Sequence, residues 1–187
     1  MIIAVAEFDS PIGLINIAVC DGRLCALGFA DRWRWRLDVL SRRWEPIEVR
    51  AGSDPAGVVG RLRAYFAGDV PVLDSIEVDP AGTPFQQRVW RALRLIPPGR
   101  TVSYGELARS IGAPAAVRAV GAANGANPIG IVIPCHRVIG VDGRLVGYGG
   151  GLERKRWLLQ HEHANAGGMP DLFTTPRSAS LAGRADE

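Results

Sequence analysis

The sequence predicts an α+β protein in which a small, mainly antiparallel β-sheet is followed by a helical part with a helix-turn-helix. Residues 14–29, LINIAVCDGRLCALGF, form two apolar runs joined by Asp21-Gly22, a dipeptide typical of a tight hairpin. From residue 82 onward, helix-start signals follow one another at short intervals. With 187 residues and 47% hydrophobic content, the chain can bury the core of one ordinary domain or two small ones.

The first half holds the predicted sheet. The segments IIAVAEF (2–8) and VPVLDSIEVD (70–79) flank the hairpin and are expected to add strands to it. Residues 31–44, DRWRWRLDVLSRRW, are rich in Arg and Trp. We interpret them as an amphipathic helix that covers the sheet rather than as a stacking patch for nucleic acid. GVVGRLRAYFAG (57–68) predicts a second helix.

The second half carries successive helix boundaries. Residues 83–86, TPFQ, combine an N-cap, a proline at the first helical position and a capping-box glutamine. Ser103 with Glu106 forms another capping box, and a further short helix is expected over 114–125. Two short helices joined by a Gly-containing turn have the form of a helix-turn-helix. ERKRWLLQHEH (153–163) predicts the last helix, and the Gly-, Pro- and Ser-containing stretch after it is expected to be disordered.

Basic charge gathers in the second half of the chain. Residues 1–81 hold nine Arg against twelve acidic residues, whereas residues 82–163 hold eleven Lys and Arg against four. This asymmetry favours a polyanionic partner, nucleic acid first, although a solvated basic face would have the same composition. The apolar runs are too short to cross a bilayer and the N-terminus lacks the basic start of a signal peptide, so a soluble, cytoplasmic protein is expected.

Three cysteines are present, and an odd number without a secretion signal argues against a disulfide framework. Cys20 and Cys25 have no nearby histidine, so we interpret them as small core residues, with structural zinc as the minor alternative. Cys135 differs, because NPIGIVIPCHRVIG (127–140) places it directly before a histidine and an arginine.

The neighbours of Cys135 suit a reactive thiol. The thiolate is the reactive form of cysteine, whose unperturbed pKa is about 8.5, and a histidine or positive charge favours it. Adjacent residues of an extended chain point to opposite faces, so contact between Cys135 and His136 requires a turn at Pro134 or a bridging water. A histidine base also needs a carboxylate to orient it, and Glu162 or Glu106 could serve. By residue types alone, a structural thiol is equally compatible.

Four segments together resemble one family, the O6-alkylguanine-DNA alkyltransferases, also called methylated-DNA–protein-cysteine methyltransferases. IPCHRVIG resembles the active-site signature of that family. The resemblance extends in order and spacing through GTPFQQRVWRALRLIPPGRTVSYGELA, RAVGAANGANPI and GYGGGLERKRWLL. It covers residues 82–163 tightly and the first half loosely.

The resemblance implies DNA repair by direct transfer of an alkyl group from O6 of guanine to Cys135, once per molecule and without a cofactor. His136 would act through a water and be held by Glu162, and Asn127 would support this network and the turn. Tyr104 would protonate the departing guanine. The target nucleotide must be flipped out of the duplex, because its O6 atom is buried there.

The same resemblance assigns the binding residues. The second helix of the helix-turn-helix would lie in the minor groove, where its small residues allow close approach, and Arg118 would insert into the base stack. The further DNA-binding residues would be Ser103, Ala116, Ala119, Asn124 and Arg137. The alkylated base would be held by Val138, Tyr148, Gly149 and Gly150. Position 149 is glycine where some relatives have serine, which predicts a roomier pocket.

The implied organisation has three parts: a ribonuclease-H-like α/β domain over 1–81, an alkyltransferase and DNA-binding domain over 82–163, and a tail over 164–187. The expected partner is double-stranded DNA with O6-alkylguanine. The protein is expected to be a monomer in solution, with room for several molecules side by side on DNA. No metal is expected, because the Cys/His set of the zinc site known in some relatives is missing.

Three rival functions make different demands on the sequence. A damage binder that does not repair has another residue, typically Trp, in place of Cys135. A Cys-His-Glu hydrolase needs no DNA, which the helix-turn-helix and the basic half disfavour. A plain DNA-binding regulator has no use for a reactive thiol.

Overall fold

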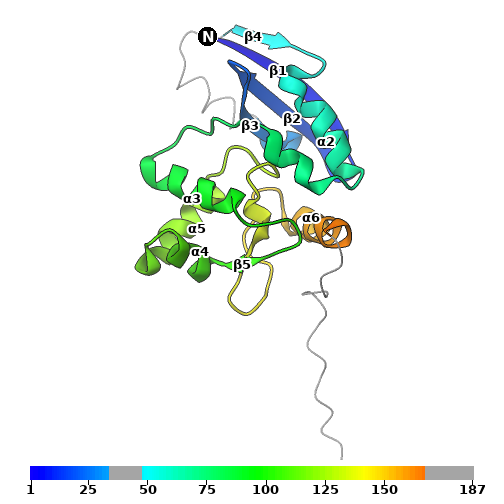
Figure 1. Cartoon of the computed structure of the whole chain (residues 1–187). Helices are drawn as coiled ribbons and strands as arrows, with labels where there is room; N and C mark the ends of the chain where they lie inside the picture. The colour runs from blue at the N-terminus through cyan, green and yellow to red at the C-terminus, as the bar shows by residue number, and fades with distance from the viewer. Residues whose placement is uncertain (34–47, 167–187) are drawn as a thin grey trace, which may run out of the picture.

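The computed structural model describes residues 1–33 and 48–166 (Figure 1). Its N-terminal part contains a four-stranded sheet in the order β3-β2-β1-β4. The antiparallel strands β1, β2 and β3 are followed by β4, which runs parallel to β1. The strand bounds are Ile2–Ser10, Gly13–Cys20, Arg23–Phe29 and Glu48–Ala51. The predicted mainly antiparallel sheet is therefore confirmed.

The hairpin between β2 and β3 turns at Asp21-Gly22, as its sequence predicts. Both residues have positive φ, 48° for Asp21 and 75° for Gly22. This is the backbone of a type I′ turn, whose twist matches that of the flanking strands. Because the turn sets the register of two strands with buried interiors, it also decides which side chains enter the core.

Helix α2 (Val58–Phe66) covers the sheet, as Figure 1 shows. The carboxylate of Asp54 caps its first turn by accepting hydrogen bonds from the backbone N–H groups of Val59 and Gly60. Phe66 stacks on Phe8 of β1 with ring centroids 5.7 Å apart. The predicted helix over 57–68 is thus confirmed, and it brings the buried side chain of Tyr65 toward the C-terminal part.

The expectation of a strand over 70–79 is wrong. Residues Val70–Ser75 form a 3-10 helix. Pro71 cannot donate to a strand ladder, and Val70 and Leu73, three residues apart, are both buried on one side of the 3-10 turn. Within the predicted strand, Val78 forms an isolated β-bridge with Leu24 of β3. The helix expected over 31–44 lies mostly outside the described residues; a 3-10 helix spans Ala30–Arg32.

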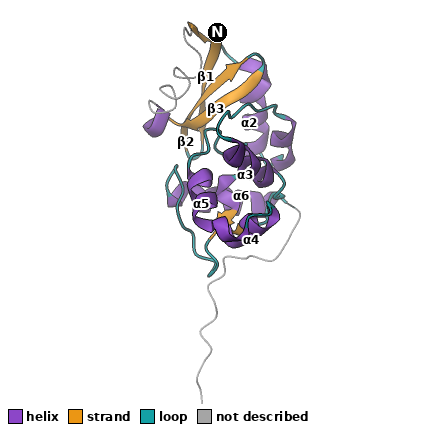
Figure 2. Cartoon of the chain, turned by 90° about the vertical axis from the view of Figure 1, so that its left-hand side faces the viewer, coloured by secondary structure: helices purple, strands orange, loops and turns teal. Residues whose placement is uncertain are grey.

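The described C-terminal residues, up to 166, form four α-helices, which group together below the sheet (Figure 2). They are α3 (Pro84–Arg94), α4 (Tyr104–Ser110), α5 (Val117–Gly125) and α6 (Leu152–Asn165), with a 3-10 turn at Pro114–Ala116 before α5. Both predicted capping boxes are present, at the starts of α3 and α4. Helices α4 and α5 form the predicted helix-turn-helix. Within the described ranges, none of the helices has the length and apolar content needed to span a bilayer.

The two parts are joined through strand β3. The N–H of Leu27 donates to the carbonyl of Pro128, and the carbonyl of Leu27 accepts from the N–H of Gly130, both at 3.0 Å. Buried residues of both parts form one continuous core cluster. The sheet therefore directly supports the loop that leads to Cys135.

The cap of α3 gives a prediction for stability. The side chain of Thr83 accepts a hydrogen bond from the N–H of Gln86, so Thr83→Ala leaves that helix N-terminus without its cap. We expect the free energy of unfolding to fall by about 1 kcal/mol. Thr83→Ser keeps the hydroxyl and should stay close to the wild type. Urea denaturation of the three proteins measures the difference, and equal losses in both variants would contradict the capping role.

Candidate active site

Cys135 lies in a tight turn between a buried loop and a short strand. Residues Cys135–Arg137 form a single 3-10 turn, closed by a hydrogen bond from the N–H of Arg137 to the carbonyl of Pro134. Strand β6 (Val138–Ile139) follows and pairs in parallel with β5 (Val102–Ser103). The chain thus turns at Pro134, one of the two arrangements that the sequence left open. Cys135 is 7% exposed and lines a cavity.

The loop before Cys135 is held from inside by Asn127. Its amide nitrogen donates to the carbonyl of Ile133 at 2.8 Å, and its amide oxygen accepts from the N–H of Ile129 at 3.0 Å. Between these residues Ile131 has a φ of 68°, a strained conformation for a β-branched residue. The side chain of Asn127 therefore supports the turn, as the resemblance implies, and offsets the strain of the loop.

Glu162, on α6, is the centre of a fully buried polar network. Its Oε1 accepts from Nε2 of His136 at 2.8 Å and from the hydroxyl of Tyr65 at 3.0 Å. Arg137 donates to both carboxylate oxygens, from Nε at 2.8 Å and from Nη2 at 2.9 Å. Three donors thus converge on Oε1 and one on Oε2, so both oxygens of the carboxylate are hydrogen-bonded. Since Nε2 of His136 faces Glu162, Nδ1 is its other nitrogen, and it has no hydrogen-bond partner among the described residues.

The charges of this network follow from burial and pairing. Burial alone raises the pKa of Glu162, but the attraction of His136 and the hydrogen bonds of His136 and Arg137 outweigh it and hold this pKa well below its usual range. Because Arg137 is always charged, the carboxylate stays ionised even beside a neutral imidazole. Burial lowers the pKa of His136, and Glu162 opposes that shift. The site therefore holds a neutral histidine base against a permanent carboxylate.

Glu106, the other candidate carboxylate, lies in the capping box at the start of α4. Its side chain accepts hydrogen bonds from the N–H and the hydroxyl of Ser103, both at 2.7 Å. It is exposed and completes the capping box of α4. The structure thus selects Glu162 as the partner of His136.

Tyr104 stands at the first position of α4, half-buried. Burial raises the pKa of its phenol, and the nearby charge of Cys135 raises it further. The phenol therefore keeps its proton at neutral pH. A phenol that stays protonated and lies close enough to Cys135 to interact with its charge can donate a proton to a group next to the sulfur.

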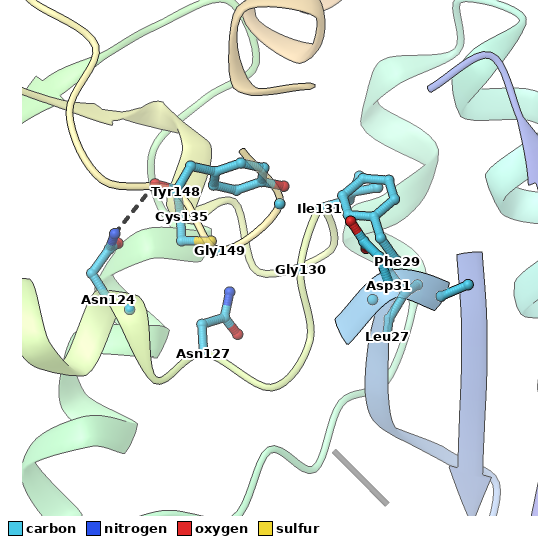
Figure 3. A pocket seen from close by; sticks show the side chains of 14 residues that line it. Leu27, Phe29, Asp31, Asn124, Asn127, Gly130, Ile131, Cys135, Tyr148 and Gly149 are labelled. Carbon is cyan, nitrogen blue, oxygen red and sulfur yellow. Dashed lines mark hydrogen bonds between the residues drawn. The ribbon is translucent and has the colours of Figure 1, made fainter. Parts of the chain in front are cut away.

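The cavity beside Cys135 has a volume of about 550 Å³. Tyr148, Gly149 and Gly150 form one side of it, and Figure 3 shows the ring of Tyr148 beside the thiol of Cys135. That ring and the imidazole of His136 are nearly perpendicular, at 81°, with centroids 6.4 Å apart. A Cβ added at Gly149 would meet nothing within 4 Å, so glycine leaves open space there.

Val138 lies behind the cavity wall rather than in it. The carbonyl of this buried residue accepts from Nζ of Lys155 at 2.6 Å, and the same ammonium donates to the carbonyl of Val146 at 2.7 Å. Burial lowers the pKa of Lys155 to about 8, and the charge of Cys135 opposes this shift. Lys155 thus joins β6 to the loop that carries Tyr148.

The exposed face of α5 carries the predicted DNA contacts. Arg118 and Ala119 are exposed, and Ala116 is half-buried just before the helix. Ser103 is half-buried at the cap of α4. The long, positively charged side chain of Arg118 therefore projects from a surface of small side chains.

Two residues assigned to DNA binding from the sequence lie inside the protein instead. Arg137 is buried, and besides Glu162 it bonds the carbonyl of Ile96, so it cannot reach a phosphate. Asn124 is buried and lines the cavity, where its amide approaches the carbonyl of Cys135 at 3.5 Å. Because a helix has one inward face, Asn124 points away from the surface that carries Arg118.

Sequence reasoning missed three contributions to the site. Lys155 lies seven residues before Glu162, with Leu158 and Leu159 between them, so helical periodicity could have placed both polar residues on the buried face of α6. Tyr65 also lies on a buried helical face, but no sequence signal links it to Glu162. The segment 27–31, which forms the far side of the cavity, likewise carries no motif.

The buried carboxylate gives a prediction on pH-dependent stability. Glu162→Gln removes the charge that compensates Arg137, and we expect the free energy of unfolding at neutral pH to fall by roughly 3–5 kcal/mol. Since the folded-state pKa of Glu162 is lowered, its contribution is complete above the unfolded pKa of about 4.3 and is lost as pH falls toward the folded value. The difference in unfolding free energy between wild type and variant should therefore become smaller below about pH 4.

Denaturant unfolding over a pH series measures this gap. Glu153→Gln is the matched control, because Glu153 is an exposed residue of the same helix that pairs with Arg156 at the surface. It should change stability by less than about 0.5 kcal/mol. A gap for Glu162→Gln that stays constant with pH would contradict the assigned charge state.

Comparisons with known proteins agree with this geometry. Residues 84–164 match the family model described as 6-O-methylguanine DNA methyltransferase, DNA binding domain. The methylated-DNA–protein-cysteine methyltransferase of Salmonella typhimurium is 49% identical over 161 residues, which cover 83% of this chain and 93% of that protein. The Mycolicibacterium paratuberculosis protein of the same name is 50% identical over 168 residues, covering 88% and 95%.

A solved structure shows the same fold. The crystal structure of Mycobacterium tuberculosis OGT in complex with DNA aligns with a TM-score of 0.72 and 46% identity, covering 87% of this chain and 94% of that one. Fold, identity and coverage agree, and DNA is the partner. The chain therefore belongs to the methylated-DNA–protein-cysteine methyltransferase family and is a DNA-repair enzyme.

Proposed function

We propose that Cys135 is the residue that receives the alkyl group, and that O6 of guanine is the atom that gives it up. The observation that carries this is the position of Cys135: it lines a cavity, directly beside a buried histidine–carboxylate pair. Displacement at a methyl carbon requires a soft, desolvated nucleophile, and a thiolate on a cavity wall meets that need.

His136 activates this thiol. Its Nε2 is held by Glu162, so its Nδ1 accepts the thiol proton, through a water molecule. Glu162 stabilises the resulting imidazolium without taking the proton, because its own pKa is held low. Asn127 keeps the preceding loop in place and so positions Cys135.

The transfer then balances as a single displacement. The bond between Sγ of Cys135 and the alkyl carbon forms while the bond from that carbon to O6 breaks, and the electron pair of the broken bond stays on guanine. Tyr104 gives the guanine anion a proton and is reprotonated, so that the proton lost by the thiol ends on guanine. The thioether has no route back to thiol, and each molecule reacts once. Tyr148, Gly149 and Gly150 hold the base, with Val138 supporting them through its backbone.

DNA binds on the face of α4 and α5. We propose that α5 enters the minor groove, where Ala116 and Ala119 allow close approach, and that Arg118 fills the space left by the flipped nucleotide. Ser103 contacts the backbone near the start of α4. The protein acts as a monomer, with room for neighbours along the DNA, and divides into domains over 1–81 and 82–163 with a tail over 164–187. The exposure of Arg118 supports this assignment.

Intact-protein mass tests the reaction directly. After incubation with a duplex that carries one O6-methylguanine, the protein should gain the mass of one methylene unit, located on the Cys135 peptide. Cys135→Ser should gain nothing. Cys25→Ala is the matched control, because Cys25 lies buried in a separate cluster of the sheet, and it should react like the wild type. Unchanged mass with preferential binding of the damaged duplex would instead indicate a damage binder that does not repair.

The role of Arg118 has its own test. Arg118→Ala should slow repair of the duplex by ~10-fold or more, because extrusion of a base costs a few kcal/mol, while the reaction with the free base should be unaffected. Arg109→Ala removes another exposed arginine, at the end of α4, and should have a much smaller effect on the duplex. Single-turnover rates on duplex and on free base give the comparison. Equal losses on both substrates would rule out the inserted-arginine role.

A further inference from the structure

We propose that Tyr65 is a positioning residue for alkyl transfer. Its hydroxyl group, which the N-terminal part of the chain supplies, limits how strongly Glu162 holds His136 and so keeps this histidine available as a base. The inference rests on the proposed role of His136 in activating Cys135. It goes beyond that role because it gives helix α2 a share in the chemistry.

The hydroxyl of Tyr65 competes with His136 for one oxygen atom. Oε1 of Glu162 accepts from the hydroxyl of Tyr65 at 3.0 Å, from Nε2 of His136 at 2.8 Å and from Nη2 of Arg137 at 2.9 Å. A carboxylate oxygen offers about two lone-pair positions. Three donors therefore share these positions, and the bond to His136 is weaker than it would be without the hydroxyl. Each added donor also lowers the basicity of the carboxylate.

Burial makes this competition effective. The side chains of Tyr65, His136 and Glu162 are fully buried, so bulk water cannot replace a lost donor. Burial and the charge of Glu162 raise the pKa of Tyr65, so its phenol keeps its proton and remains a donor at neutral pH. The competing group is thus a neutral donor that changes the attraction of the carboxylate without adding a charge.

Several charged groups surround the histidine. Burial lowers the pKa of His136, Glu162 raises it, and the charges of Arg137 and Lys155 lower it again. A base must stay neutral until the thiol gives up its proton, so too strong an attraction by Glu162 would protonate His136 in advance. Tyr65 acts on this one opposing contribution. Of the other titratable groups, Tyr148 also faces Tyr65.

The end of α2 is fixed against α6, which sets the position of the hydroxyl (Figure 1). Nε2 of His161 donates to the carbonyl of Tyr65 at 2.7 Å. The imidazole of His161 stacks on Trp157, with centroids 4.9 Å apart and planes at 14°, and the ring of Phe66 packs on Trp157 at 5.6 Å. Since Glu162 directly follows His161, the turn of α6 that holds the backbone of Tyr65 also carries the carboxylate that its side chain reaches.

Tyr65→Phe tests the inference because it removes only the hydroxyl. Without this competitor Glu162 holds the imidazolium more strongly, so the pKa of His136 should rise. A base with a higher pKa is protonated at higher pH, so the acidic limb of the pH–rate profile should move up by ~0.5 pH unit or more. Single-turnover rate constants on a duplex with O6-methylguanine measure the limb. An NMR titration of the imidazole in the unreacted protein measures the pKa of His136 directly.

Two further changes grade the effect. Replacing Tyr65 by 3-fluorotyrosine keeps the ring and makes the hydroxyl a stronger donor, so the acidic limb should move to lower pH. His161→Ala frees the backbone of Tyr65 and should move the limb upward by less than Tyr65→Phe does. His161→Gln, whose amide can still donate to the carbonyl of Tyr65, should lie closer to the wild type than His161→Ala.

Val59→Ala is the matched control. Val59 is buried on the same helix, and the loss of its methyl groups should lower stability without moving the limb. An acidic limb and a His136 pKa that stay in place in Tyr65→Phe would overturn the inference, as would an equal shift in Val59→Ala or an upward shift with 3-fluorotyrosine. Absence of methyl transfer by the wild type would overturn the proposed function instead, and the NMR titration would then still decide the effect of Tyr65 on His136.

Discussion

The burial of one carboxylate organises this protein. An ionised carboxylate taken out of water is costly unless every lone pair finds a donor. The donors of Glu162 come from α2, through Tyr65, and from the turn after Cys135, through His136 and Arg137. Two separate segments, α2 and the turn that holds Cys135, must therefore meet at α6 before the carboxylate is satisfied. The geometry of the reactive turn is a consequence of that meeting.

The same constraint separates two kinds of positive charge in the C-terminal part. Arg137 donates to Glu162 and keeps the carboxylate ionised, while burial lowers the pKa of His136. Arg118, by contrast, is exposed on α5. The excess of basic residues in residues 82–163 thus includes both a buried arginine beside Glu162 and an exposed arginine on the surface that we propose binds DNA.

The N-terminal sheet has more than a supporting role. Strand β3 bonds the loop before Cys135 through Leu27, Tyr65 reaches Glu162, and Arg154 binds the carbonyl of Ile12 and the carboxylate of Asp31. Each of these contacts joins the N-terminal part of the chain to a segment of the C-terminal part. The cavity is consequently a feature of the whole chain, although every motif that identifies the family tightly lies after residue 81.

Much of the protein follows from local sequence. The turn at Asp21-Gly22 and the capping boxes at Thr83 and Ser103 depend on neighbouring residues, whose backbone preferences act over a few positions. Local preference also explains the error over 70–79, where apolar content suggested a strand but Pro71 and the spacing of buried residues produced a 3-10 helix.

Only the tertiary structure decided which polar groups meet. Spacing in the sequence cannot choose between Glu162 and its alternative Glu106 as the partner of His136, and it does not show that Arg137 is buried against Glu162. Tyr65 carries no sequence signal for its contact with Glu162. The physical reason is that hydrogen bonding in a buried site depends on distances between segments of different origin, and those distances exist only once the core has packed.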